Sequence, residues 1–334
     1  MTERILLFDT SQTSENLGDY IIMDSVNKEL CELFPEDLLI RTPTHDTVGK
    51  FAHSWGDRTK LKFVGGSNLL SGRFTRRDVA QWRFGFHDAN KIHEIIGIAL
   101  GWQSYRQYNR LIDQPFVAAQ KHLYRKSLSS KYLHSVRDSY TQKKLEEYGF
   151  QSINTACVTM WRLDIKKLNQ LPLCKANKVV TTITDYRNDE QYIKAYESML
   201  TTLLKTYNQV ALWIQAPPDK ELIDRLNIPN KSRIQLINPS LEAYDEVLSE
   251  DVDYVGTRLH AGIRALQHNR RATIIEVDNR ATEIAKDTNL PVLSMKNIDR
   301  LKEVVEHPTP IDLHIPFDEI KRWKQQFSPY KDKE

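Results

Sequence analysis

Short apolar runs alternate with longer amphipathic runs along the chain. This alternation is typical of a parallel β-sheet whose strands are joined by crossover helices. In the first half, the apolar runs predict strands at 4–8, 37–41, 61–66, 92–100, 132–137 and 152–158. Runs with helical spacing predict helices at 19–34 and 138–149, with Asp138 placed to cap the second one.

A second series of the same kind follows the polar segment 164–178. Its apolar runs predict strands at 179–184, 209–215, 233–238, 253–257 and 272–277. Its amphipathic runs predict helices at 190–207, 239–250, 260–268 and 280–288. Two βα series of similar size imply an α/β protein with two Rossmann-like domains facing across a cleft. We expect these domains at 1–168 and 169–314, with 315–334 as a C-terminal helix of the kind that packs across the hinge.

Composition narrows the class of protein. Of the 334 residues, 40% are apolar and 27% charged, as in ordinary globular proteins. The net charge of +3 is too even for nucleic acid to be the expected partner. The three cysteines lie far apart and lack metal-binding spacing, which fits a reducing compartment. The first residues lack the apolar length of a signal peptide, and no stretch has the ~20 apolar residues of a membrane span, so we expect a cytoplasmic protein.

The stretch "DYVGTRLHAGIRAL" (253–266) contains the strongest candidates for chemistry. Arg258 and His260 lie two apart, between a predicted strand and a predicted helix. Extended backbone points residues i and i+2 to one side, and the carboxyl end of a strand beside a helix N-terminus is where anions bind in α/β folds. A guanidinium can grip carboxylate or phosphate with two bonds, and a histidine can move a proton. The ordinary alternative is a structural histidine beside a solvated arginine.

The turn "NLGD" (16–19) follows the first predicted strand. Asn16, Gly18 and Asp19 are turn-forming residues, and Asp19 can cap the next helix. The segment therefore fits either a plain β-to-α turn or a loop that faces a ligand. It is not a dinucleotide-binding fingerprint.

Three further segments place candidate residues at strand ends. Gly65, Gly66 and Ser67 end an apolar strand, where glycine permits either close approach to a ligand or a tight turn. Arg137 ends another strand and either pairs with neighbouring Asp138 or binds an anionic group. Arg187 follows the first strand of the second series and is a candidate for the same pocket as Arg258.

No metal site is expected. Asp251 and Asp253 form a D-x-D pattern, but it precedes a strand, at the end of a parallel sheet that does not carry the chemistry. The basic and aromatic segment 72–87 fits sugar or phosphate binding, a membrane surface, or a solvated helix with a core-facing aromatic side.

Five segments together resemble the polysaccharide pyruvyl transferase family. They are "NLGD" (16–19), "GGSNLL" (65–70), "VRDSYTQKKLEEYG" (136–149), "YVGTRLHAGIRALQ" (254–267) and "IIEVDNRATEIA" (274–285). The R-L-H segment followed by D-x-R-x-x-E is the specific part of the resemblance. The chain departs from the family pattern at Val158 and Arg271, where the family often has proline.

The resemblance implies a two-Rossmann architecture similar to that of B-type glycosyltransferases. It implies transfer of the pyruvyl group of phosphoenolpyruvate to two hydroxyls of a sugar in a polysaccharide or its precursor, with release of phosphate. Phosphoenolpyruvate is then a co-substrate, and no cofactor is expected. Arg258 and His260 match the family's R-x-H that contacts phosphoenolpyruvate, and they are the expected catalytic residues.

The expected substrate-binding residues are more widely spread. The second domain is the expected phosphoenolpyruvate side, and the first-domain loops are expected to face a saccharide acceptor. The full set is Asn16, Gly18, Asp19, Gly65, Gly66, Ser67, Arg137, Arg187, Thr257, Asp278, Arg280 and Glu283.

Two other functions stay open at this point. One is a glycosyltransferase that uses a sugar nucleotide on the same architecture, and the other is a catalytically silent member of a polysaccharide assembly complex. The acceptor sugar is also open, including whether a lipid diphosphate carries it. Segment 72–87 would suit a lipid-linked acceptor and peripheral contact with the inner membrane surface.

Overall fold

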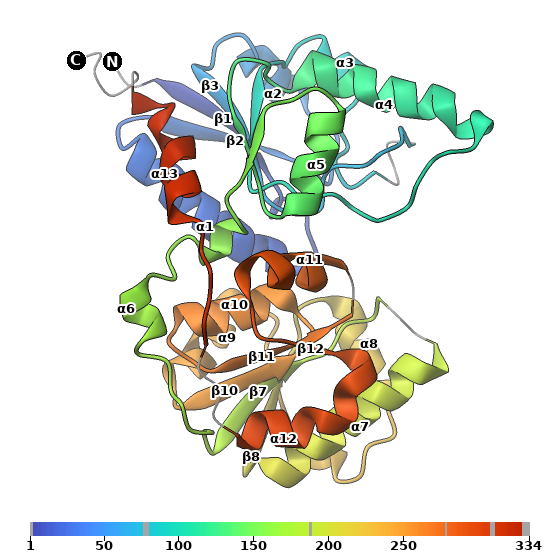
Figure 1. The fold of residues 1–334 in the computed structure, drawn as a ribbon, viewed down its shortest axis with the longest axis vertical. Helices are drawn as coiled ribbons and strands as arrows, with labels where there is room; N and C mark the ends of the chain where they lie inside the picture. The colour runs from blue at the N-terminus through green and yellow to red at the C-terminus, as the bar shows by residue number, and fades with distance from the viewer. Residues whose placement is uncertain (1–2, 76–79, 187–188, 278, 308–310, 329–334) are drawn as a thin grey trace. The chain divides into compact units, whose positions relative to one another are not determined.

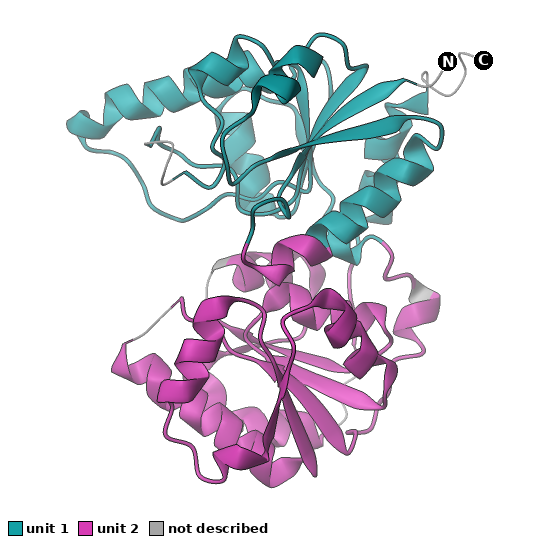
Figure 2. Cartoon of the chain, turned by 180° about the vertical axis from the view of Figure 1, so that it is seen from behind, with its two compact units in different colours: residues 1–14, 22–161, 315–334 teal, residues 15–21, 162–314 magenta. Residues whose placement is uncertain are grey.

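The computed structural model describes residues 3–75, 80–186, 189–277, 279–307 and 311–328 (Figure 1). Contacts divide the chain into two compact units (Figure 2). Unit 1 contains residues 1–14, 22–161 and 315–334, and unit 2 contains residues 15–21 and 162–314. This division differs from the expected one, because the NLGD turn groups with unit 2 and the C-terminal helix groups with unit 1.

Unit 1 is built on parallel strands. A four-stranded sheet has the order β2-β1-β3-β4, and β5 and β6 form a parallel pair. The strands are β1 (Arg4–Asp9), β2 (Leu38–Pro43), β3 (Leu61–Gly65), β4 (Ile95–Ile98), β5 (His134–Val136) and β6 (Ser152–Asn154). The helices are α1 (Leu17–Leu33, whose first residues group with unit 2), α2 (Lys50–Trp55), α3 (Phe86–Ala89), α4 (Gln114–Ser127), α5 (Ser139–Glu147) and α13 (Phe317–Gln325).

Successive side chains of β1 lie on alternate faces of the unit 1 sheet. Leu6 and Phe8 pack in the cluster that includes α4 and α5, whereas Ile5 and Leu7 pack in the cluster that includes α1 and α13. This is the period-two pattern of a strand covered on both faces. Trp323 of α13 is fully buried in the second cluster and donates to the Leu133 carbonyl at 2.9 Å.

Unit 2 has a single six-stranded parallel sheet in the order β12-β11-β10-β7-β8-β9. Its strands are β7 (Lys178–Thr182), β8 (Gln209–Trp213), β9 (Ile234–Ile237), β10 (Val252–Gly256), β11 (Ala272–Glu276) and β12 (Val292–Ser294). Counted within the unit, this order is 3-2-1-4-5-6, the order of the Rossmann fold. The strand order reverses between β7 and β10, so the fold itself predicts a binding site at their carboxyl ends.

Helices cover both faces of the unit 2 sheet. They are α6 (Ile165–Leu168), α7 (Glu190–Thr206), α8 (Pro217–Arg225), α9 (Leu241–Ser249), α10 (Leu259–Gln267), α11 (Asn279–Thr288) and α12 (Leu301–Glu306). One apolar cluster joins α7, α8 and α12 to the sheet. On the other face Tyr244 of α9 stacks on Trp213 of β8, with ring centroids 4.1 Å apart.

The observed elements confirm most of the expected ones. The Asp138 cap is confirmed, since its carboxylate accepts from Thr141 N at 2.6 Å. The sequence pattern missed α4 and α8, although each carries proline in its first turn, a recognised start signal. Within the described ranges, no helix combines the length and apolarity required to cross a membrane.

Candidate functional site

The candidate site lies in unit 2, where the strand order reverses. β10 pairs directly with β7, and Gly256 lies opposite Thr182. Beyond the last paired residues, Thr257 N donates to the Thr182 carbonyl at 3.0 Å. The two strand ends are therefore fixed to each other where the fold places a ligand.

A buried hydroxyl pair shapes the turn from β10 into α10. Tyr254 donates its hydroxyl proton to the Arg258 carbonyl at 2.7 Å and lies 2.7 Å from the Thr182 hydroxyl. Arg258 N in turn donates to both hydroxyl oxygens, at 3.2 Å each. Burial raises the pKa of Tyr254, so this hydroxyl stays protonated and the turn keeps its geometry at neutral pH.

Arg258 is almost fully buried, with 4% of its surface exposed. Its Nε donates to the Ile183 carbonyl at 3.3 Å, one terminal nitrogen donates to the Tyr186 hydroxyl at 2.9 Å, and the other pairs with the Asp219 carboxylate. A guanidinium carries five N–H groups, and these contacts use three of them. The side chain is thus held in one orientation with donor capacity remaining.

Asp219 is the buried counter-ion of Arg258. Its side chain is 0% exposed, and its second carboxylate oxygen accepts from Ala216 N at 3.1 Å at the start of α8. Burial raises the pKa of the Asp219 carboxyl, and the charge of Arg258 opposes that rise. The carboxylate therefore fixes the arginine but is itself held in an environment that disfavours its charge.

Two arginines, Arg258 and Arg280, contact the Tyr186 ring. The Arg258 guanidinium carbon lies 4.9 Å from the centroid of the Tyr186 ring, and that of Arg280 lies 5.1 Å from it. Both distances are within cation–π range. Tyr186 is 47% exposed, so the ring that gathers the two guanidinium groups also reaches solvent.

His260 lies in the first turn of α10, next to the NLGD turn. A Cβ atom added at Gly18 would come 2.9 Å from Gln215 Nε2 and 3.5 Å from His260 Nδ1, so Gly18 lies directly beside both side chains. Asn16 Oδ1 accepts from Gln215 Nε2 at 2.8 Å and from Gly18 N at 3.1 Å. The motifs N-L-G-D and R-L-H, more than two hundred residues apart, therefore belong to one site.

The N-terminus of α10 completes the site. Arg258 is its N-cap residue and makes no side-chain capping bond. The first helical bond runs from Gly262 N to the Arg258 carbonyl, so the N–H groups just before it lie outside the helix ladder. Backbone donors and the helix dipole favour an anion at this position.

The structure does not bring all the expected residues together. Arg187 and Asp278 lie outside the described residues. Glu283 pairs with Lys286 on α11, and Arg137, Gly65, Gly66 and Ser67 belong to unit 1.

The unit 1 candidates have structural explanations of their own. Arg137 pairs with Asp138 at 3.5 Å and donates to the Asn68 amide oxygen, as the ordinary alternative expected. Gly66 has a φ of +55°, and a Cβ atom there would collide with Ile22. A turn and tight packing against α1 account for this glycine without a ligand.

The D-x-D pattern has a structural role as well. Asp253 is buried and accepts from the Tyr207 hydroxyl at 2.7 Å and from Arg271 at 2.6 Å. In the part of the chain that the structure describes, no group of three or more His, Cys, Asp and Glu side chains is placed to hold a metal.

Sequence reasoning missed Gln215, Asp219 and Tyr186. Gln215 lies just beyond β8, a position that the strand-end argument used for Arg258 could have flagged. It is buried, and its amide oxygen has no hydrogen-bond partner among the described residues, so its acceptor capacity is unused there. Nothing near Asp219 in the sequence marked it, because its partner is 39 positions away and α8 was not predicted.

Comparison with protein families decides the affiliation of the chain. Residues 16–279 match the family described as polysaccharide pyruvyl transferase. The chain belongs to this family. The matched range covers most of the chain, including N-L-G-D, R-L-H and Arg258's partners, so the resemblance seen in the sequence is confirmed. Membership in the polysaccharide pyruvyl transferase family indicates a transferase enzyme of polysaccharide biosynthesis that acts on a saccharide acceptor.

Solved structures confirm the fold class. MnaA of S. aureus, solved with UDP, has a TM-score of 0.52 at 12% identity, over 99% of this chain and 97% of that one. UDP-N-acetylglucosamine 2-epimerase from Rickettsia bellii has a TM-score of 0.50 at 11% identity, over 98% and 95%. This pyruvyl transferase family member therefore shares the α/β architecture of B-type glycosyltransferases, built on two Rossmann-like units. A comparison with curated proteins finds no match.

Proposed function

We propose that this protein transfers the pyruvyl group of phosphoenolpyruvate to two hydroxyls of a saccharide, which forms a pyruvate ketal and releases phosphate. The observation that carries the proposal is the assembly of Arg258, His260 and the α10 N-terminus where the unit 2 strand order reverses. Phosphoenolpyruvate has a carboxylate and a phosphate on three carbons, so its site needs several fixed donors close together.

The charges around Tyr186 fit such a compact polyanion. Arg258 and Arg280 lie on the same ring, and Asp219 neutralises only one positive charge. Arg258 and the α10 N–H groups are held by the fold before a ligand arrives, which lowers the reorganisation needed in the transition state.

The reaction balances without a redox step. A proton adds to the methylene carbon, and a sugar hydroxyl attacks the cationic C2 carbon and loses its own proton. Phosphate then leaves with the C–O bonding pair, and the second hydroxyl closes the ketal. The two hydroxyl protons supply one proton for the new methyl group and one for phosphate.

His260 is the group that we assign to proton transfer or to assistance of the departing phosphate. Gln215, whose amide nitrogen lies near Gly18 and whose amide oxygen has no hydrogen-bond partner among the described residues, is the group that we assign to accept from the attacking hydroxyl. The proposal requires no cofactor, because phosphoenolpyruvate carries its own leaving group. A cytoplasmic location follows from the same proposal, since that is where phosphoenolpyruvate is produced.

Phosphate release tests the proposal directly. We expect phosphoenolpyruvate to raise the melting temperature, and UDP and GDP not to do so. Phosphate release is then measured over free and lipid-diphosphate-linked glycans. His260→Gln should lower turnover about 10²–10⁴-fold, the range for loss of a general acid or base.

His268→Gln is the matched control, since His268 follows the same helix and pairs with Asp245. It should keep wild-type turnover. Stabilisation by UDP or GDP alone would instead favour a sugar-nucleotide enzyme. Binding of phosphoenolpyruvate without phosphate release on any glycan would favour a silent assembly protein.

A further inference from the structure

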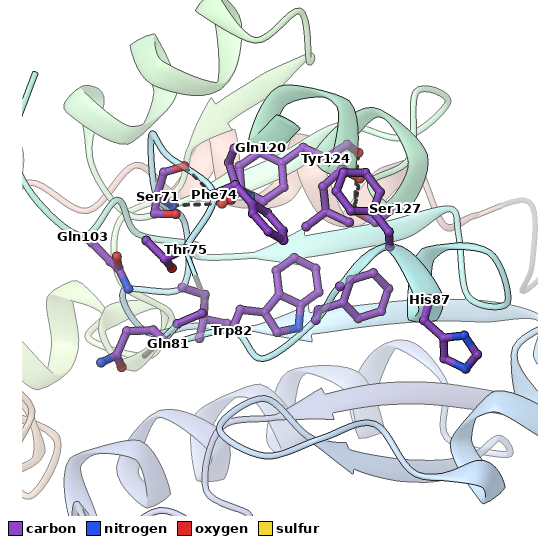
Figure 3. Close-up of a pocket in the computed structure, with 16 residues that line it drawn as sticks. Ser71, Phe74, Thr75, Gln81, Trp82, His87, Gln103, Gln120, Tyr124 and Ser127 are labelled. Carbon is purple, nitrogen blue, oxygen red and sulfur yellow. Dashed lines mark hydrogen bonds between the residues drawn. The ribbon is translucent and has the colours of Figure 1, made fainter. Parts of the chain in front are cut away.

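A cavity whose lining differs chemically from the Arg258 site lies in unit 1. It measures about 230 Å³ and is formed by the loops that follow β3 and β4 together with α3 and α4. Figure 3 shows Thr75, Gln81 and Gln103 at one end, Trp82 in the middle and His87 at the other end. Loops at the carboxyl ends of parallel strands are where ligands bind in open α/β sheets.

The described lining of this cavity carries no acidic or basic residue apart from one histidine. Its sixteen described lining residues contain no Asp, Glu, Lys or Arg, although such residues make up 27% of the chain. Its titratable members are His87 and Tyr124, and burial raises the pKa of Tyr124, which keeps that hydroxyl neutral. An anion would find no counter-charge among these sixteen residues, so their chemistry favours an uncharged ligand.

The lining combines flat apolar surfaces with amide groups. Five aromatic side chains line the cavity: Phe74, Trp82, Phe84, Phe86 and Tyr124. Three glutamines join them: Gln81, Gln103 and Gln120. Each amide offers both a donor and an acceptor, the pair needed to bind neighbouring hydroxyls. The apolar C–H face of a sugar ring packs on aromatic rings, and its hydroxyl edge bonds to amides.

One buried donor points to a ligand independently of this composition. Trp82 is 94% buried, since only 6% of its surface is exposed, and its indole N–H has no hydrogen-bond partner among the described residues. The Tyr124 hydroxyl, by contrast, is fully engaged with the backbone of Ser71. A buried donor without a partner costs free energy unless a ligand or water accepts from it.

The size of the cavity sets the size of the ligand. Drug-sized ligands occupy pockets of about 300–1,000 Å³, so a cavity of about 230 Å³ suits a single ring rather than a sugar nucleotide. We infer that this cavity binds one uncharged pyranose ring, as a saccharide subsite separate from the Arg258 site. The role of that ring as part of the acceptor rests on the function proposed above.

Binding of uncharged methyl pyranosides to the full chain tests the inference. Saturation-transfer NMR is run with methyl glucoside, galactoside, mannoside and N-acetylglucosaminide. We expect at least one to bind, and Gln81→Ala and Gln103→Ala each to weaken it about tenfold, or about 1.4 kcal/mol, for a lost hydrogen bond. Both residues lie at the accessible end of the cavity, so the variants should melt like the wild type.

Gln107→Ala is the matched control, an exposed glutamine outside the cavity lining, and it should bind like the wild type. Stabilisation by phosphoenolpyruvate should be unchanged in all three variants, so this inference and the proposed function fail separately. The inference is overturned if no pyranoside binds, if the two cavity variants bind like Gln107→Ala, or if geraniol, a short prenol, binds the cavity and the pyranosides do not.

Discussion

Each unit buries an arginine just beyond a parallel strand, Arg137 after β5 and Arg258 after β10. Arg137 is 1% exposed and is enclosed by Asp138, Asn68 and the backbone at Gly101. Arg258 is 4% exposed, but it contacts the half-exposed Tyr186 ring. The sequence context of the two residues is similar, and the surroundings separate them.

The difference leads us to expect that a strand-end position alone does not make an arginine a ligand residue. Arg137 is paired with Asp138 inside unit 1, so we expect it to stabilise the fold of that unit. Arg258 lies where the Rossmann order of unit 2 reverses, beside a helix N-terminus, and shares Tyr186 with a second arginine. We therefore expect variants of the two residues to affect different measurements.

The largest effect should come from Arg137→Ala. It leaves the buried Asp138 without its charged partner, which costs about 3–5 kcal/mol of unfolding free energy. Urea unfolding measures this loss, and Arg125→Ala, at an exposed site on α4, serves as the control. At temperatures where the Arg137→Ala protein is still folded, phosphoenolpyruvate should stabilise it as it stabilises the wild type. Its loss in a folded Arg137→Ala protein would assign Arg137 to the substrate after all.

Arg258→Ala should instead affect catalysis. Loss of one preorganised anion contact is expected to cost about 2.7–4 kcal/mol, or 10²–10³-fold in phosphate release. Arg258→Ala is combined with Asp219→Asn in a double variant, so that no unpaired carboxylate is left in the core. Arg264→Ala, which breaks the pair with Asp245 at the other end of α10, should keep turnover. Near-normal turnover of a folded Arg258→Ala/Asp219→Asn protein would refute the assignment.

Asp219 should make the stability of Arg258→Ala depend on pH. Burial raises the folded-state pKa of Asp219, so its contribution to stability is full below the unfolded pKa and is lost as pH rises through the folded pKa. Removing Arg258 removes the charge that opposes this rise. We expect the unfolding free energy of Arg258→Ala to fall more steeply with rising pH than that of the wild type, by at most about 1.4 kcal/mol per pH unit. The additional pH dependence of the unfolding free energy should disappear in Arg258→Ala/Asp219→Asn. If it persists there, another titrating group causes it.

Tyr186→Phe should give the smallest effect. It keeps the ring beside Arg258 and Arg280 but removes the hydroxyl that accepts from Arg258. We expect the binding free energy of phosphoenolpyruvate to weaken by about 0.5–1.5 kcal/mol. The KM for phosphoenolpyruvate should then rise several-fold while kcat changes little. Tyr186→Leu, which also removes the ring, should raise KM further. Equal values for the two variants would show that the ring does not position the arginines.

Most of the strands and helices could be predicted from the sequence, because hydrophobic periodicity directly indicates elements that pack against a core. The alternation in β1 and the Asp138 cap are local signals of this kind. The strand order that brings β7 beside β10 is a tertiary property and could not be read from spacing.

The site was readable only in part for the same reason. Arg258 and His260 are neighbours in the sequence, so a local argument could pair them. Asp219 and Gln215 meet Arg258 and Asn16 only through the folded sheet, and nothing near them in the sequence records these partners. The sequence left two roles open for Arg137, pairing with neighbouring Asp138 or binding an anion, because Asn68 and Gly101, which also enclose it, come from distant segments.

The division of the chain bears on how this protein can be dissected. Unit 2 takes in residues 15–21, which precede most of unit 1 along the backbone. A truncated clone that starts near residue 162 would lose Asn16, the hydrogen-bond partner of Gln215, together with Gly18 beside His260. Isolated expression of this half would need the short peptide restored, by a designed linker or by co-expression.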